Sequence, residues 1–203
     1  MKSKRRTPEQ TRHLLLDNAL ACFQRQGYCA TTVDQICAEA RITKGSFFYH
    51  FPTKEELGVE VIRWWSQRVA ETYSKAWQDS GADPLQQLDE LFSVMTRSTE
   101  YPGQPCICAW GMMAQEMALT HEKIRQLCEQ EFKVWTQHVL RLLEAARKHY
   151  PPSRRFDPER VAWFLNSLWQ GSMLVGKTCQ SPELIRSNLQ LARHYVMSHF
   201  SDA

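Results

Sequence analysis

Apolar residues recur along most of the chain at intervals of three and four positions, which is the spacing of residues on one face of an α-helix. In the segment 8–26, for example, Leu15, Ala19 and Phe23 lie four residues apart. No segment shows a convincing alternation of apolar and polar residues, the pattern of a half-buried β-strand. The pattern therefore predicts an all-α protein.

Helix start signals divide this pattern into about nine helices. A hydroxyl or carboxylate side chain followed by proline favours a helix N-cap and first position. Such pairs are Thr7-Pro8, Asp83-Pro84, Asp157-Pro158 and Ser181-Pro182. Thr32 with Gln35, and Thr53 with Glu56, have the spacing of capping boxes. The predicted helices cover about residues 8–26, 33–40, 44–50, 54–77, 84–99, 107–119, 121–149, 158–177 and 182–199.

The composition is that of a globular protein large enough for one ordinary domain and a small one. The chain has 203 residues, of which 43% are hydrophobic and 23% charged, so it can bury a core. The apolar run Leu14-Leu15-Leu16 after the basic N-terminus is too short for a signal peptide, and no segment approaches the ~20 apolar residues of a membrane span. We therefore expect a cytoplasmic protein with no membrane partner.

The seven cysteines form an odd set at positions 22, 29, 37, 106, 108, 128 and 179. In a reducing compartment most of them are expected to be free thiols that pack as small hydrophobic residues. A C-x-x-C pair is absent, which argues against a zinc ribbon.

Basic residues are concentrated at the start of the chain. Residues 1–54 carry 9 Lys and Arg against 4 Asp and Glu, whereas residues 55–203 carry 16 against 18. Such a basic segment on a near-neutral body is the electrostatic pattern of a DNA-binding head. On charge alone, a basic tail that serves only solubility explains it equally well.

The first fifty residues contain three predicted helices, of which the second and third are joined by the tight turn Arg41-Ile42-Thr43. This arrangement is a helix-turn-helix, in which one helix braces on the DNA backbone and the next lies in the major groove. The alternative is a helix-turn-helix that only packs within the protein.

The segment from Thr31 to Leu57 closely resembles the signature of the tetracycline-repressor (TetR) family, and Gly27-Tyr28 fits it too. The sequence match covers about residues 8–60, and the number of helices extends the resemblance to the whole chain as architecture. The resemblance implies a helix-turn-helix DNA-binding domain over residues 1–53 and a ligand-binding and dimerisation domain over residues 54–203.

Within this motif, each candidate residue has a physical reason to contact DNA. Thr32 can place its hydroxyl and nearby backbone N–H groups against a phosphate, and Gly45 allows close approach to the groove. Phe47 and Phe51 should face inward. The residues expected to contact DNA are Thr32, Thr43, Lys44, Gly45, Ser46, Phe48, Tyr49, His50 and Lys54.

Two positions depart from the family pattern. Phe48 stands where the family often has Tyr, which removes a hydroxyl contact to phosphate and allows contact with a thymine methyl group. Arg41 stands where the family usually has Gly in the turn, and a left-handed conformation there would cost about 1 kcal/mol.

By resemblance, the last two helices should pair with their symmetry mates in a four-helix bundle and make the protein a homodimer. Large and small apolar residues on these helices suit close helix packing. The candidate interface residues are Trp163, Leu168, Gly171, Gly176, Leu184, Leu191 and Tyr195. An intramolecular core is the alternative for the same residues.

The remaining helices are expected to enclose a cavity for a small-molecule effector. Large aromatic side chains together with Met make an adaptable apolar wall, although each such residue taken singly is more often plain core. The candidate wall residues are Trp77, Phe92, Met95, Cys108, Trp110, Met112, Met113, Trp135 and Trp169.

The segment from Ile107 to Glu116 resembles a Gly-Cys-x-x-Gly-x-x-x-x-Glu element of a TetR-family subset, with Cys108, Gly111 and Glu116 in the matching positions. A thiol at a helix N-terminus has a lowered pKa and is available to oxidants or electrophiles. Two alternatives stay open: Cys108 is a buried, inert residue, or it binds a metal with Cys106 and His121. We expect no metal and no cofactor.

Together these observations predict a repressor that binds a palindromic operator in double-stranded DNA and is released by a small apolar ligand or by an oxidant or electrophile. A small helical enzyme is one alternative, but the sequence has no Gly-rich phosphate loop, H-E-x-x-H or G-x-S-x-G motif. A protein-interaction module without DNA binding is another, and Lys44, Lys54 and the basic N-terminal arm argue against it.

Overall fold

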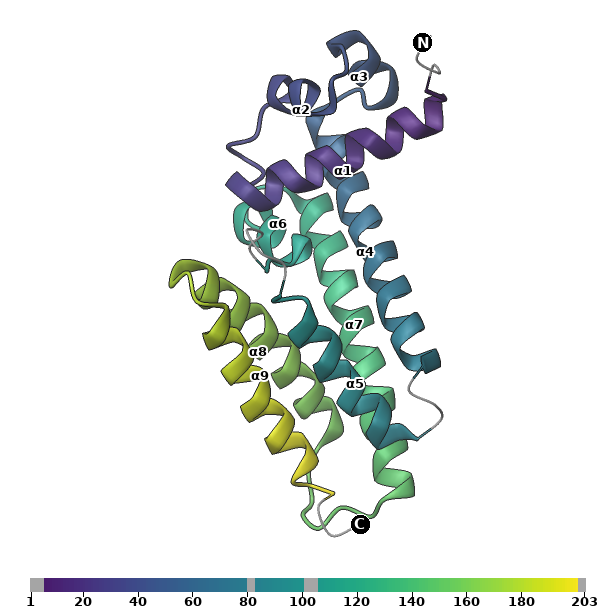
Figure 1. The fold of residues 1–203 in the computed structure, drawn as a ribbon, viewed down its shortest axis with the longest axis vertical. Coiled ribbons are helices and arrows are strands. Elements are labelled where there is room, and N and C mark those ends of the chain that lie inside the picture. Colours follow the sequence, from purple (N-terminus) through teal and green to yellow (C-terminus); the bar gives the residue numbers. More distant parts are fainter. Residues whose placement is uncertain (1–5, 80–82, 101–105, 201–203) are drawn as a thin grey trace. The chain divides into compact units, whose positions relative to one another are not determined.

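The computed structural model describes residues 6–79, 83–100 and 106–200, and in these ranges the chain forms nine α-helices and no strand (Figure 1). The prediction of an all-α protein is confirmed. The helices are α1 (Pro8–Gln26), α2 (Val33–Ala40), α3 (Lys44–His50), α4 (Lys54–Asp79), α5 (Pro84–Arg97), α6 (Ala109–Met117), α7 (Glu122–His149), α8 (Pro158–Thr178) and α9 (Pro182–Met197). Over the described ranges, no helix combines the length and apolarity needed to cross a membrane.

The helices begin where the N-cap signals predict. The hydroxyl of Thr7 accepts a hydrogen bond from the backbone N–H of Gln10 at 3.2 Å, and the Gln10 side chain accepts one from the N–H of Thr7 at 3.0 Å. The same reciprocal pair joins Thr32 and Gln35 at the start of α2. These bonds satisfy N–H groups that have no partner within the helix.

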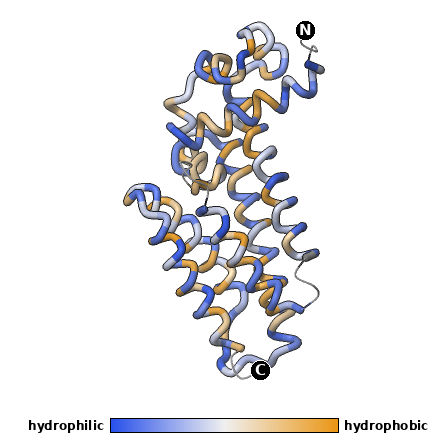
Figure 2. Tube along the Cα trace, in the orientation of Figure 1, coloured by the Kyte–Doolittle hydropathy of each residue, from blue (hydrophilic) through white to orange (hydrophobic). Residues whose placement is uncertain are grey.

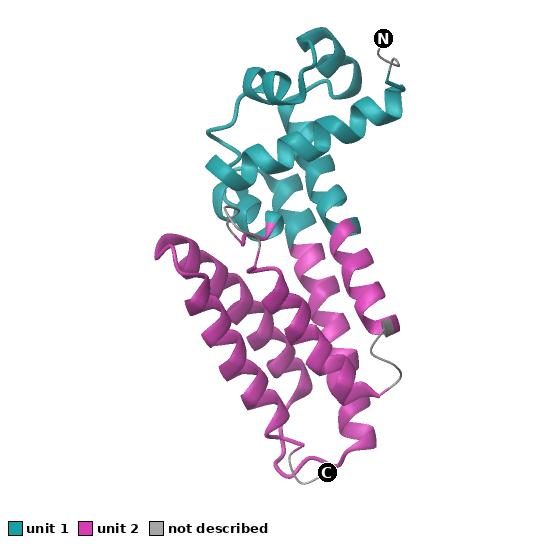
Figure 3. Ribbon diagram, in the orientation of Figure 1, with its two compact units in different colours: residues 1–67, 109–128 teal, residues 68–108, 129–203 magenta. Residues whose placement is uncertain are grey.

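The chain forms two compact units (Figure 3). Unit 1 consists of residues 1–67 and 109–128, and unit 2 of residues 68–108 and 129–203. Helices α4 and α7 therefore each contribute to both units. The sequence interpretation divided the chain at residue 53, whereas the structure groups α6 and the first half of α4 with the helix-turn-helix.

The core of unit 1 forms where α1 packs on α2 and α6. Its fully buried side chains include Leu15, Phe23, Ile36, Phe47 and Leu57. Figure 2 shows hydrophobic and hydrophilic positions interspersed along the helices. Burial of this apolar face is what holds short helices such as α2 and α3 in place.

The core of unit 2 forms where α9 packs on α8 and α5. Leu88, Leu91 and Leu165 are fully buried there. One polar pair lies within this core: the amide of Asn166 donates to the hydroxyl of Thr136 at 2.8 Å. The pair satisfies polar atoms that would otherwise destabilise the apolar interior.

Candidate DNA-binding and effector sites

The turn between α2 and α3 contains a residue in the left-handed conformation. Arg41 ends α2 in the left-handed region at φ 52° and ψ 49°, where the family pattern has Gly. The N–H of Ile42 donates to the carbonyl of Cys37 at 2.9 Å and closes the helix end. Thr43 then caps α3 by accepting from the N–H of Ser46 at 3.2 Å. The turn therefore fixes the direction in which α3 leaves α2.

Helix α3 buries one face and exposes the other. Phe47 and Phe51 are buried, as predicted, whereas Phe48 and Tyr49 are 49% and 77% exposed. A Cβ atom on Gly45 would meet nothing closer than the Thr43 hydroxyl at 4.0 Å, so the N-terminal end of α3 is open on that side. Exposed aromatic residues beside an open backbone form a surface that can contact base edges.

The other DNA candidates lie on or beside this surface. Thr32 is exposed, while Ser46 and His50 are half-buried. The ring of His50 lies edge-on to that of Tyr49, with 5.0 Å between centroids. Lys44 is exposed and forms an ion pair with Asp34 of α2, which raises the pKa of Lys44. The basic residues Lys2, Lys4 and Arg5 lie outside the described residues.

Lys54, one of the residues expected to contact DNA, lies against Tyr28 and Cys29. Its ammonium group lies 4.4 Å from the ring centroid of Tyr28 and 3.4 Å from the carbonyl oxygen of Cys29. Burial lowers the pKa of Lys54, and the charges of Cys29 and Glu116 act in the opposite direction. Lys54 thus has partners within unit 1, and its contact with DNA stays a prediction.

Glu116 of α6 makes a contact that the sequence interpretation did not identify. Its carboxylate oxygens accept hydrogen bonds from two successive backbone N–H groups, that of Tyr28 at 2.9 Å and that of Cys29 at 2.7 Å. One signal for this residue was present in the sequence, the match of Glu116 to a family element, and that match did not indicate what Glu116 does. The contact joins α6 to the loop of residues 27–32 between α1 and α2, which we call the α1–α2 loop.

Three of the predicted cavity residues lie on α6 in the core of unit 1. Trp110, Met112 and Met113 are buried, and the indole N–H of Trp110 donates to the hydroxyl of Ser66 at 3.0 Å. A Cβ atom on Gly58 would lie 3.3 Å from the terminal methyl group of Met113. These side chains pack within unit 1, and their contact with an effector stays a prediction.

The other cavity candidates belong to unit 2 and include a stacked aromatic cluster. Trp77 stacks on Tyr73 at 5.5 Å and lies 5.8 Å from the ring of His138. Tyr73 is buried, which raises its pKa, while a hydrogen bond with Trp135 acts to lower it. The sequence interpretation included Trp77 and Trp135 but missed Tyr73. Phe92 and Met95 are also buried in unit 2, and Trp169 is half-buried.

Cys108 is buried and directly precedes α6. The predicted lowering of its pKa stays a prediction. Cys106 is half-buried, with its sulfur 3.6 Å from the hydroxyl of Ser98, and burial raises its pKa. All seven cysteines are free thiols, as expected. Across the parts of the chain that are described, no group of three His, Cys, Asp or Glu side chains is placed to hold a metal ion.

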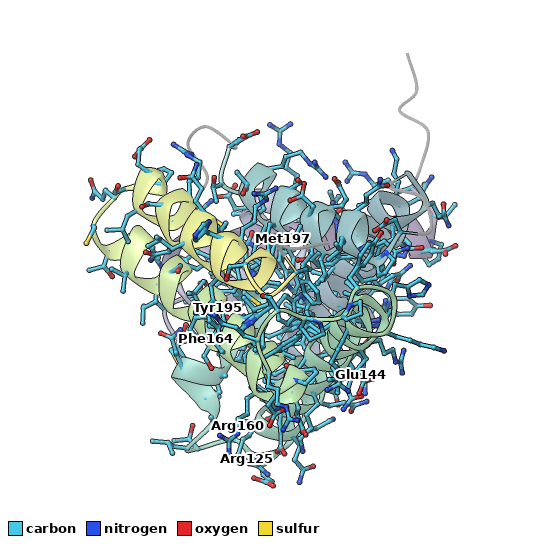
Figure 4. The ribbon with its side chains drawn as sticks, turned by 90° about the horizontal axis from the view of Figure 1, so that it is seen from below. Arg125, Glu144, Arg160, Phe164, Tyr195 and Met197 are labelled. Carbon is cyan, nitrogen blue, oxygen red and sulfur yellow. The ribbon has the colours of Figure 1, made fainter. Side chains whose placement is uncertain are left out.

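Helices α8 and α9 carry exposed apolar residues. Trp163, Leu191 and Tyr195 are 40%, 67% and 43% exposed. Figure 4 shows Phe164 beside Tyr195, and their rings lie edge-to-face at 5.6 Å. Phe164, Leu174 and Val175 are exposed as well and were not among the predicted interface residues. This apolar surface is larger than the sequence suggested and suits a helical partner.

The predicted interface glycines have different surroundings. Gly171 is exposed, and a Cβ atom there would meet nothing within 4 Å. Gly176 is buried, and its Cβ would lie 2.3 Å from a side-chain carbon of Ile185 on α9. Gly176 therefore allows close packing of α8 on α9 within one chain, and its contact with a partner subunit stays a prediction. Leu168 and Leu184 are half-buried.

Two family models match the chain. The model described as bacterial regulatory proteins of the tetR family matches residues 15–61, and the model of the tetracyclin repressor-like C-terminal domain matches residues 84–192. The HTH-type transcriptional repressor DhaR of Mycobacterium sp. strain GP1 is 27% identical over 83% of this chain and 82% of its own length. The HTH-type transcriptional regulator YxaF of Bacillus subtilis is 35% identical over 83% of this chain and 85% of its own.

Solved structures show the same fold. A TetR-family regulator from Agrobacterium tumefaciens aligns with a TM-score of 0.84 at 17% identity, over 93% of this chain and 98% of its own. The reduced form of E. coli NemR aligns with a TM-score of 0.79 at 19% identity, over 90% of this chain and 94% of its own. The chain therefore belongs to the TetR family of transcriptional regulators, whose members bind DNA and act as dimers.

Proposed function

We propose that this regulator is a cytoplasmic, homodimeric repressor that binds a palindromic operator with α3 and leaves it when an effector acts on unit 2. The observation that carries the proposal is the exposed face of α3, where Phe48 and Tyr49 project from a helix held by the buried Phe47 and Phe51. The name of DhaR as a repressor supports the direction of regulation.

Dimerisation would make the exposed face of α3 specific for a palindromic operator. Two heads about 34–36 Å apart contact successive turns of the major groove and read a palindrome. The apolar surface formed by Trp163, Leu191 and Tyr195 supports a symmetric contact between two chains. In such a contact the same residues of both chains meet, which suits a self-complementary apolar surface.

DNA binding is tested with the DNA upstream of this protein's own gene. Fluorescence anisotropy should show saturable binding of that fragment, with at least about a thousandfold weaker binding to a scrambled fragment of equal length. Equal affinity for both fragments would contradict an operator-specific repressor.

The effector is proposed to be a small apolar molecule that contacts the buried aromatic residues of unit 2. Trp77, Phe92, Met95 and Trp135 supply apolar contacts, and Tyr73 supplies a buried hydroxyl group that can fix a polar substituent. Apolar walls with a few polar groups are typical of small-molecule sites.

A thiol trigger is the second candidate for the effector response. Cys108 directly precedes α6, and the solved structure of E. coli NemR is described as a reduced form. The oxidant diamide separates the two candidates. A thiol trigger predicts that diamide releases the wild type and the Cys179→Ser control from DNA but not Cys108→Ser. Release of Cys108→Ser at an unchanged dose would reject the thiol trigger and leave the apolar ligand.

A further inference from the structure

The backbone of the α1–α2 loop is held by one carboxylate. Glu116 accepts from the N–H groups of Tyr28 and Cys29, which are 88 and 87 residues away in sequence. Both distances, 2.9 and 2.7 Å, are those of charge-assisted hydrogen bonds, which are roughly twice as strong as neutral ones. Three residues after Cys29, Thr32 caps α2. The carboxylate therefore contacts the backbone immediately before the helix-turn-helix.

The loop leaves a space that the carboxylate fills. Gly27 ends α1 at φ 90°, a conformation that residues with a side chain rarely adopt. A Cβ atom on Gly27 would lie 2.7 Å from one carboxylate oxygen of Glu116. Only glycine at this position allows both the backbone conformation and the close approach of Glu116.

Helix α4 holds the same loop through Lys54. The ammonium group lies against the carbonyl of Cys29 and over the ring of Tyr28. The loop is therefore bound by a carboxylate at two of its N–H groups and by a cation at one of its carbonyl groups. Burial, together with the nearby acidic groups of Glu55, Cys29 and Glu116, raises the pKa of Tyr28 to about 12. A Cβ atom on Gly58 would lie 2.8 Å from this ring, so α4 packs closely against it.

We propose that Glu116 is a positioning residue for operator binding, and that the released state of the repressor is the state in which its carboxylate has left the N–H groups of Tyr28 and Cys29. The proposal rests on the repressor function proposed above. Helix α6 begins at Ala109, directly after Cys108, and Glu116 is the eighth residue of this helix. Because a hydrogen bond of 2.7–2.9 Å is largely lost by 3.6 Å, a shift of α6 by roughly 1 Å suffices to break the contact.

Breaking the contact would loosen the entry to α2 without unfolding the core of unit 1. The buried residues Leu15, Phe23 and Ile36 keep α1 and α2 packed. The loop, however, would lose the bonds that hold its backbone to α6. Small displacements of the DNA-reading helices are sufficient to lower sequence-specific affinity. Binding to non-specific DNA depends on phosphate charges and should change little.

The test compares Glu116→Gln with Glu122→Gln in the full-length protein. Glutamine keeps the volume of Glu116 but has one acceptor oxygen in place of two, and its amide group cannot accept from the second N–H. Glu122 is the matched control because it is an exposed glutamate of unit 1, bonded only to Arg125 and Gln126 of its own helix in the described contacts. Hydrogen exchange at Tyr28 and Cys29, affinity for the upstream fragment and affinity for scrambled DNA are measured together.

Glu116→Gln should accelerate exchange of both amides and weaken binding to the upstream fragment by about tenfold or more, with scrambled DNA bound as before. Glu122→Gln should behave as wild type. Glu116→Asp keeps the carboxylate on a side chain that is one methylene shorter, so its affinity should lie between those of Glu116→Gln and the wild type. If the glutamine variant does not fold, weaker binding of the upstream fragment by Glu116→Asp supports the proposal, and wild-type binding with faster exchange at Tyr28 and Cys29 contradicts it.

Two results would overturn the proposal. One is unchanged exchange at Tyr28 and Cys29, because the carboxylate would then not hold the loop. The other is faster exchange with affinity for the upstream fragment within about twofold of wild type. Failure of the wild type to bind that fragment is a different result, since it contradicts the repressor function itself.

Discussion

The ammonium group of Lys44 on α3 lies 2.7 Å from a carboxylate oxygen of Asp34 on α2. Both side chains are exposed, and the pair spans the turn of the helix-turn-helix. In a DNA complex, Lys44 would have to exchange this carboxylate for a phosphate or a base edge. Without DNA, the helix-turn-helix therefore holds one of its candidate DNA-binding cations in an internal ion pair.

Asp34→Asn should strengthen binding to the upstream DNA by roughly two- to fivefold, because it releases Lys44 from a weak exposed pair. Glu39→Gln is the charge-matched control, since Glu39 pairs with Arg25 at 3.0 Å in the same unit. Lys44→Ala should weaken binding and reduce the slope of log affinity against log salt by about one. An equal gain from Asp34→Asn and Glu39→Gln would show a general charge effect and contradict the specific role of Lys44.

Gly176→Ala should lower the free energy of unfolding by about 1–3 kcal/mol, because its Cβ would overlap the side chain of Ile185. Gly171→Ala on the same helix should raise it by about 0.5–1 kcal/mol, since the site is open and alanine favours a helix. Urea unfolding at one protein concentration measures both variants. Equal destabilisation by the two substitutions would contradict the packing described for Gly176.

Leu191→Lys should shift the protein from dimer to monomer, because it places a charge in the middle of an apolar interface. Leu119→Lys is the control, since Leu119 is fully exposed and belongs to unit 1. Sedimentation velocity at micromolar concentration distinguishes the two species. A Leu191→Lys variant that sediments as wild type would exclude this face of α9 from the dimer contact.

The buried ring of His199 should lower the free energy of unfolding in acid. Both ring nitrogens are buried without a hydrogen-bond partner in the described structure, and the ring stacks on Phe156 at 4.5 Å. Burial, with the charge of Arg154, lowers the pKa of His199. Because the unfolded chain, with a His pKa of about 6.5, then binds the proton first, the free energy of unfolding decreases as pH falls below that value.

Urea unfolding at about pH 7.5 and about pH 5 measures this loss, and His199→Phe should reduce it. His138, whose pKa burial also lowers, should retain part of the pH dependence in that variant. His194→Gln, at an exposed site of α9, serves as the control. The same pH dependence in His199→Phe as in the wild type would contradict the role of the buried ring.

Features encoded by neighbouring residues were predictable from the sequence. The hydroxyl and glutamine of the box at Thr32 lie three residues apart, so their spacing alone places the start of α2. The four-residue spacing of Phe47 and Phe51 likewise fixed which face of α3 is buried.

Contacts between distant residues were not predictable in this way. Glu116 binds backbone N–H groups, which every residue except proline has, so the identities of Tyr28 and Cys29 gave no signal. Gly171 and Gly176 look alike in the sequence, and only the position of Ile185 on α9 distinguishes them. Lys54 had the expected charge, but its direction depends on a loop that precedes it by 25 residues.

The affinity of Tyr49→Ala for the upstream DNA fragment tests most directly whether α3 reads the operator. Tyr49 is the most exposed aromatic side chain of α3, so its removal should leave the fold intact. Leu119→Ala removes a fully exposed apolar side chain elsewhere in unit 1 and should bind as wild type. Tyr49→Ala should bind the fragment at least about tenfold more weakly, with unchanged binding to scrambled DNA. Wild-type affinity and wild-type discrimination in Tyr49→Ala would contradict DNA reading by this face of α3.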